Sequence, residues 1–349
     1  MRPLRILTWH VHGSYLYYLV QSRHQFFLPV KPDRPEGYGG KLSGFEWGDN
    51  VQDIPADQVR DQEFDCILFQ SQKNYLEDQY EILSESQRQL PRLYLEHDPP
   101  RASPTDTPHV VDDANILLVH VTHFNQLMWN NGRSPTCVIE HGVMVPENVS
   151  YDGSPGRGVV VVNGLQSRGR RLGVDIFDRV QQTIPLDLVG MKSETLGGLG
   201  EIPHADLAKF LVQYRFFFNP IRYTSMGLAV REAMMLGLPI VGLATTEMAT
   251  VIENGVSGYV DTNVDRLIEI MQRLLNNPAE ANHLSQGAKR VAQERFNIQR
   301  FVRDWDQAFA CVCGQSVDTA PKNYLSEVLY EANSLDQRTR FPVWRFGWR

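Results

Sequence analysis

Short apolar runs alternate with segments of helical periodicity along most of this chain. Strand-like runs stand at 5–11, 25–30, 66–71, 90–97, 116–122 and 137–143, and most of them end in polar residues or glycine. A helical pattern occupies 14–22 between the first two runs. Apolar runs of this length, separated by amphipathic segments, are typical of βα units with buried parallel strands. The first part of the chain is therefore predicted to be a parallel sheet with helices.

The same rhythm restarts after a segment rich in glycine and proline, YDGSPGRG at 151–158. Strands are expected at 158–164, 186–191, 216–221, 239–244 and 257–261, with helices around 174–182 and 206–213. Longer helices are predicted at 265–276, 279–295 and 298–312. The restart indicates two doubly wound α/β domains joined near 151–158. Ligands are expected between them, at the carboxyl ends of the strands.

Composition and charge narrow the possible functions. The chain has 349 residues, 42% hydrophobic residues and a net charge of −7, which favours a folded, non-nucleic-acid-binding protein. The four cysteines have no metal spacing and are expected to be buried free thiols of a cytoplasmic protein. No apolar run is long enough to span a membrane, and the first residues indicate a strand rather than a signal peptide. The arginine- and aromatic-rich tail (313–349) is expected to pack on the protein or to give a peripheral membrane contact.

The stretch from Thr224 to Glu232, TSMGLAVRE, joins an apolar run to a predicted helix. Thr224 or Ser225 is expected to cap this helix, and the first amides near Gly227 would then be free to bind an anion. Glu232 would reach the hydroxyls of a diol. An ordinary capped helix with an ion-paired glutamate is the structural alternative.

Residues 216–260 resemble the donor-site signature of the retaining family 4 glycosyltransferases. The matching residues are Pro220, Gly227, Leu228, Glu232-Ala-Met, Gly237-Leu-Pro-Ile-Val and Asn254-Gly-Val-Ser-Gly. The chain departs from that signature in two places. Thr224 stands where the family has the first glutamate of its Glu-x7-Glu pair, and Thr246-Glu247 stands where it has Gly-Gly.

Weaker matches extend the resemblance to about residues 4–312. Gly13 stands in the first glycine-rich loop, and His97 in LEHDPP stands at the family's cleft-facing histidine. Asn163 occupies the position of an arginine that grips the diphosphate, and Arg168 or Arg171 that of the accompanying lysine. The resemblance implies that His97, Arg168 and Arg171 are catalytic. It also implies that the donor is bound by a wider group of residues, namely Gly13, Asn163, Thr224, Ser225, Met226, Gly227, Leu228 and Glu232.

The resemblance implies the GT-B fold, in which two Rossmann-like domains face each other across a cleft. We expect an acceptor domain at 1–150, a donor domain at 155–297, a crossing helix at 298–312 and a tail at 313–349. The implied activity is retaining transfer of a hexose from a nucleotide-diphosphate sugar to a polysaccharide, lipid-linked or small-molecule acceptor.

No metal site and no cofactor is expected beyond the nucleotide-sugar donor. The one Asp-x-Asp triplet, Asp304-Trp-Asp306, lies in a predicted helix, where its two carboxylates point apart. Other histidines near strand ends lack ligand spacing and are expected to be polar core or rim residues.

Three alternatives stay open at this point. The chain could bind a nucleotide sugar without transferring it, because Thr224 replaces a glutamate. It could also be a nucleotide-sugar epimerase, or a phosphorylase, although no lysine is an obvious pyridoxal anchor. A nicotinamide dehydrogenase is disfavoured because no GxGxxG follows a strand.

Overall fold

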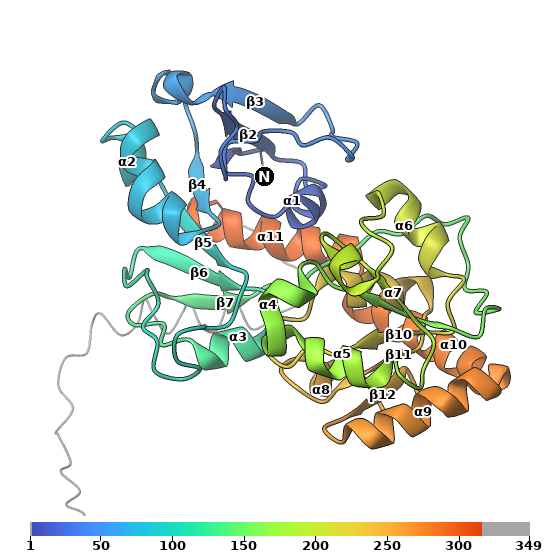
Figure 1. Ribbon diagram of the computed structural model, residues 1–349. Helices are drawn as coiled ribbons and strands as arrows, with labels where there is room; N and C mark the ends of the chain where they lie inside the picture. Colours follow the sequence, from blue (N-terminus) through green and yellow to red (C-terminus); the bar gives the residue numbers. More distant parts are fainter. Residues whose placement is uncertain (1, 316–349) are drawn as a thin grey trace, which may run out of the picture.

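The computed structural model describes residues 2–315, which form two parallel β-sheets flanked by helices (Figure 1). The first sheet has the order β3-β2-β1-β4-β5-β6-β7, and all neighbouring strands are parallel. Its strands are β1 (Arg5–Thr8), β2 (Gln25–Val30), β3 (Val51–Pro55), β4 (Cys66–Phe69), β5 (Arg92–Glu96), β6 (Ile116–His120) and β7 (Thr136–Val138). The helices of this part are α1 (Gly13–Leu19), α2 (Gln79–Ile82) and α3 (His123–Met128).

The second sheet is also parallel and has the order β12-β11-β10-β8-β9. Its strands are β8 (Gly158–Val161), β9 (Leu186–Val189), β10 (Phe216–Asn219), β11 (Ile240–Leu243) and β12 (Gly258–Asp261). The accompanying helices are α4 (Leu165–Leu172), α5 (Val174–Val180), α6 (His204–Leu211), α7 (Leu228–Leu236), α8 (Met248–Val251), α9 (Val264–Asn276), α10 (Pro278–Arg295) and α11 (Ile298–Val312). The α/β fold class with two parallel sheets is confirmed, while the predicted domain limits stay a prediction.

Strand β10 shows why these apolar runs form buried strands. Phe216 and Phe218 pack into the cluster under α5 and α9, whereas Phe217 faces the core shared with the first half of the chain. Both faces of the strand are buried, so an uninterrupted apolar run is required. Strand β3 has the opposite pattern, with Val51 and Ile54 buried and the residues between them exposed. It is an edge strand without an apolar run, so the sequence pattern did not predict it.

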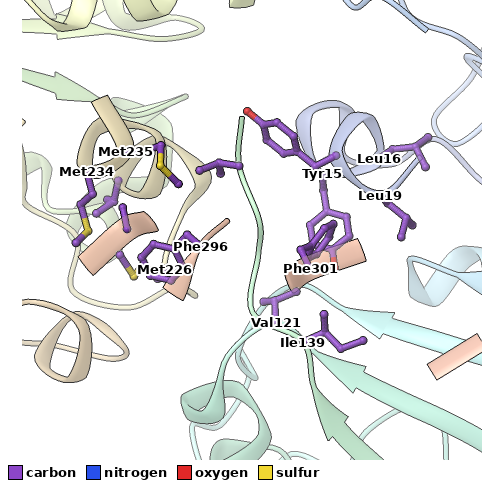
Figure 2. Packing of buried hydrophobic residues seen from close by; sticks show 14 of the residues in the cluster. Tyr15, Leu16, Leu19, Val121, Ile139, Met226, Met234, Met235, Phe296 and Phe301 are labelled. Atoms are coloured by element: carbon purple, nitrogen blue, oxygen red, sulfur yellow. The ribbon is translucent and has the colours of Figure 1, made fainter. Parts of the chain in front are cut away.

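The two halves share one hydrophobic core (Figure 2). Tyr15, Leu16 and Phe301 lie on one side of this core, and Met234 and Phe296 lie on the other. Because the packing is continuous, it fixes how the carboxyl ends of the two sheets face each other.

Helix α11 leaves the second half of the chain and lies beside α1 (Figure 1). The Asn297 side chain caps its start by accepting a hydrogen bond from the Arg300 amide. From this helix, Trp305 Nε1 donates a hydrogen bond of 3.1 Å to the hydroxyl of Tyr15 on α1. The C-terminal segment of the described chain is therefore part of the first half's core.

Cysteines are distributed differently from the expectation. Cys66 and Cys137 are buried, as predicted, but Cys311 is exposed and Cys313 is half-buried. Both of the latter lie at or just beyond the end of α11, where the helix reaches the surface. Burial of all four thiols is therefore a wrong prediction.

Candidate functional site

A cavity of about 500 Å³ lies between the carboxyl ends of the two sheets. His12, Gly13 and Ser14 line it from the loop that follows β1 and the first turn of α1. The second half contributes the loops after β8 and β9 and the start of α7, through Asn163, Gly190, Met191, Gly227, Leu228 and Glu232. The carboxyl edge of a parallel sheet is where α/β proteins bind ligands, because the strand-to-helix loops converge there.

Helix α7 begins at this cavity. Gly227 is its N-cap residue, has an extended backbone and has no side chain that could accept hydrogen bonds from the first amides of the helix. The first amides of the helix therefore lack partners within it, and Gly227 and Leu228 line the cavity. A Cβ at Gly227 would meet nothing within 4 Å, so this glycine leaves space beside the backbone for a ligand.

Neither Thr224 nor Ser225 caps α7, so the capping prediction is wrong. The Ser225 hydroxyl donates to the His97 carbonyl at 2.6 Å, and the Thr224 hydroxyl lies 3.5 Å from Asp98 Oδ1. Both hydroxyls are used across the cleft because the loop before α7 lies against the segment that follows β5. Met226 is 2% exposed and packs in the core, so its side chain lies outside the cavity lining.

Glu232, the fifth residue of α7, is 7% exposed and lines the cavity. The Tyr18 hydroxyl of α1 donates a hydrogen bond of 2.6 Å to its Oε1. His204 Nε2, at the start of α6, lies 3.7 Å from the same oxygen. A carboxylate placed in this way can accept hydrogen bonds from hydroxyl groups of a ligand in the cavity.

Arg168 and Arg171 come from α4, which is kinked at Gly169. Burial lowers the pKa of Arg171, and the nearby guanidinium groups of Arg101 and Arg168 lower it further. The Asp98 carboxylate, which pairs with Arg101, opposes this lowering. Neither Arg168 nor Arg171 is among the residues that line the cavity of about 500 Å³. Arg170 is mostly exposed and pairs with Asp175 at 2.6 Å.

Asn163 has a local structural contact. Its Oδ1 accepts a hydrogen bond of 2.9 Å from the Met191 amide, which orders the loop after β9 at the edge of the cavity. Gly13 lines the opposite side, and a Cβ there would lie 3.2 Å from the Phe45 ring. Both predicted residues are brought to the same cavity, together with Gly227, Leu228 and Glu232.

His97 follows β5 and lines a second cavity, of about 640 Å³. Its Nε2 lies 3.3 Å from Gln70 Oε1. Burial lowers the pKa of His97 well below its usual value, and the neighbouring His12 adds to this effect. The neutral imidazole can therefore hold a hydroxyl by hydrogen bonding but does not supply positive charge at neutral pH.

Four residues of the site were not predicted from the sequence: His12, Arg101, Tyr18 and His204. His12 lines both cavities, and its ring centroid lies 4.2 Å from that of His97. Burial lowers its pKa below the usual value. Arg101 stands four residues after His97 in the loop that follows β5, where this spacing predicts no contact. No local pattern indicates Tyr18 or His204, because each acts on a residue far along the chain.

Among residues 2–315, no three His, Cys, Asp or Glu side chains are grouped so that they could hold a metal ion. Asp304 pairs with Arg300 at 2.8 Å, and Asp306 Oδ1 lies 3.2 Å from His24 Nε2. The two carboxylates point to different partners, as predicted from their helical spacing. Within the same described range, no helix has the length and apolarity needed to cross a membrane. The proposed membrane contact of the tail lies outside the described residues.

A segment of the second half resembles a known family of proteins. Residues 175–277 match the family model for group 1 glycosyl transferases. A sucrose synthase from Denitrovibrio acetiphilus is 29% identical over 87 residues, a match that spans 23% of this chain and only 11% of that protein. The resemblance to this family, predicted from the sequence, is confirmed.

Solved structures of glycosyltransferases share the fold of about nine-tenths of the chain. A sucrose-phosphate synthase from Thermosynechococcus elongatus superposes with a TM-score of 0.67 and 16% identity, covering 90% of this chain and 100% of that one. HepE from Anabaena, in complex with UDP, gives 0.65 and 14%, covering 89% and 100%. The GT-B fold is therefore confirmed.

Proposed function

We propose that this chain, a GT-B protein with a group 1 glycosyltransferase segment, transfers a hexose from a nucleotide-diphosphate sugar to an acceptor hydroxyl. The observation that carries the proposal is the place of Glu232. Its buried carboxylate borders a cavity that also contains the free N-terminus of α7. The carboxylate can bind the ribose diol of a nucleotide diphosphate, and the N-terminus of the helix can bind its diphosphate.

The guanidinium groups supply the charge that the leaving group requires. When the acceptor oxygen forms its bond to the anomeric carbon, the bond from that carbon to the diphosphate oxygen breaks, and its electron pair leaves with the diphosphate. Arg168 and Arg171, on the helix that follows β8, stabilise this growing negative charge. The acceptor proton passes to the leaving diphosphate, and the guanidinium groups take the place that a metal ion has in metal-dependent transferases.

We further propose that the transfer retains the anomeric configuration. The acceptor hydroxyl then attacks, and the diphosphate leaves, on the same face of the sugar. The acceptor would enter through the second cavity, which His97 and His12 line. Neutral imidazoles in that position orient hydroxyl groups by hydrogen bonding. HepE is solved with UDP-glucose, which makes a uridine donor the first one to test. The cytoplasmic location and the polysaccharide, lipid-linked or small-molecule acceptor stay predictions.

The test is a donor and acceptor panel with the full chain. UDP-, GDP- and ADP-hexoses are incubated with monosaccharide, oligosaccharide and lipid-linked acceptors, and release of the nucleotide diphosphate is followed. Nuclear magnetic resonance of the product reports its anomeric configuration. Release that depends on both substrates and gives a retained product supports the proposal. Selective donor binding without transfer would favour a binding protein, and a changed free nucleotide sugar would favour an epimerase.

A further inference from the structure

The Tyr18 hydroxyl crosses from the first half of the chain to the proposed donor site. Tyr18 lies near the end of α1 and is 1% exposed, while Glu232 lies on α7, 214 residues away. Their hydrogen bond of 2.6 Å has the length expected for a hydroxyl that donates to a carboxylate. Figure 2 shows α1 and α7 on opposite sides of the shared core, marked by Tyr15 and by Met234 and Met235.

Tyr18 is restricted to the role of a donor in this contact. Burial raises the pKa of its hydroxyl well above the usual value, and the Glu232 carboxylate raises it further. The phenol therefore keeps its proton at neutral pH. A protonated hydroxyl facing a carboxylate forms a charge-assisted hydrogen bond, one of the stronger side-chain contacts in proteins.

The two oxygens of Glu232 have different surroundings. Oε1 accepts from Tyr18 and has His204 Nε2 at 3.7 Å. Among residues 2–315, none donates a hydrogen bond to Oε2, yet Oε2 is not one of the fully enclosed atoms without a partner. Tyr18 thus holds one oxygen, and the other has no hydrogen-bond partner in the described part of the chain and is not fully enclosed.

We propose that Tyr18 is a positioning residue that holds Glu232 in the rotamer needed to bind the nucleotide ribose. This inference rests on the proposed function, because it assigns the ribose to Glu232. The contact joins the two halves, so the Glu232 geometry depends on the first half lying against the second. Nucleotide binding and the relative position of the two halves are then energetically linked.

The test compares ligands that differ only in the ribose. Binding of UDP, GDP and ADP is measured by calorimetry, and the preferred nucleotide is compared with its 2′,3′-dideoxy analogue. Tyr18→Phe keeps the ring and removes the hydroxyl. It should weaken binding of the ribonucleotide about tenfold and change binding of the dideoxy analogue less than twofold. Tyr17→Phe is the matched control and should leave both affinities unchanged, because no described residue hydrogen-bonds the Tyr17 hydroxyl.

A double-mutant cycle with Glu232→Ala, which removes the acceptor of the Tyr18 hydrogen bond, separates positioning from general stability. Tyr18→Phe should have little further effect on ribonucleotide affinity once Glu232 is replaced. An equal loss of affinity for the ribonucleotide and the dideoxy analogue, or independent losses in the cycle, would overturn the positioning role of Tyr18. The proposal that the chain binds a nucleotide would still stand. If the wild-type chain bound none of the three nucleotides, the proposed function and this inference would both fail.

Discussion

Replacing Glu232 with glutamine removes the charge of the proposed ribose ligand and keeps its shape. The amide oxygen introduced by Glu232→Gln can still accept the Tyr18 hydrogen bond, so this contact between α1 and α7 is retained. Hydrogen bonds to charged groups contribute about 1.5–3 kcal/mol, compared with about 0.5–1.5 kcal/mol for neutral pairs. With one or two ribose hydroxyls bound, the loss is about 1–3 kcal/mol, or roughly 5- to 150-fold in affinity.

Calorimetry with the preferred nucleotide diphosphate measures this loss directly. Thermal unfolding of the variant without ligand serves as the control for folding, and its midpoint should stay within a few degrees of wild type. Pyrophosphate, which lacks the ribose, should bind wild type and Glu232→Gln equally. Unchanged nucleotide affinity in the folded variant, or an equal loss for pyrophosphate, would refute the ribose assignment.

Four further predictions follow from the same geometry. Arg171→Gln should lower kcat about 100- to 1000-fold if it contacts the leaving diphosphate, whereas Arg170→Gln, which only breaks an exposed ion pair, should change kcat less than tenfold in the same steady-state assay. Thr224→Val should lower turnover by about tenfold or change which sugar is preferred. Calorimetry should show unchanged affinity for the bare nucleotide. Burial opposes ionisation of Glu140, but its hydrogen bonds to Arg295 bring its pKa below the ordinary value of 4.5. The ionised carboxylate therefore contributes stability above that pH, and this contribution is lost as the pH falls through the lower pKa of the folded state. Urea unfolding of Glu140→Gln should show a weaker loss of stability on acidification than wild type. Chelation with EDTA should leave turnover unchanged, and a strict requirement for Mn²⁺ or Mg²⁺ would contradict the proposed leaving-group stabilisation.

Local patterns were sufficient for most of the fold. Segments such as 216–221 carry buried residues on both faces, so their apolar runs were readable as strands. The predicted helices at 265–276, 279–295 and 298–312 match α9, α10 and α11 to within a residue or two, because asparagine caps and amphipathic periodicity mark them. Edge strand β3 was missed because only two of its five residues are buried.

The contacts of the site were less predictable than its members. A threonine and a serine ahead of a helix are ordinary caps, yet Ser225 bonds the carbonyl of His97, a partner 128 residues away. Tyr18 and Glu232 meet only because the shared core sets the angle between the two sheets. Such pairs depend on tertiary packing, and no single segment contains the information that specifies them.

The central claim is that the cavity between the two sheets binds a nucleotide diphosphate. The most direct test is thermal unfolding of the wild-type chain and Glu232→Gln with UDP, GDP and ADP. A ligand at 100 times its Kd stabilises the folded state by about 2.7 kcal/mol. We predict that one of the three nucleotides raises the wild-type Tm by several degrees, and that the same concentration shifts the variant much less. Equal shifts in both proteins, or no shift with any nucleotide, would contradict the account.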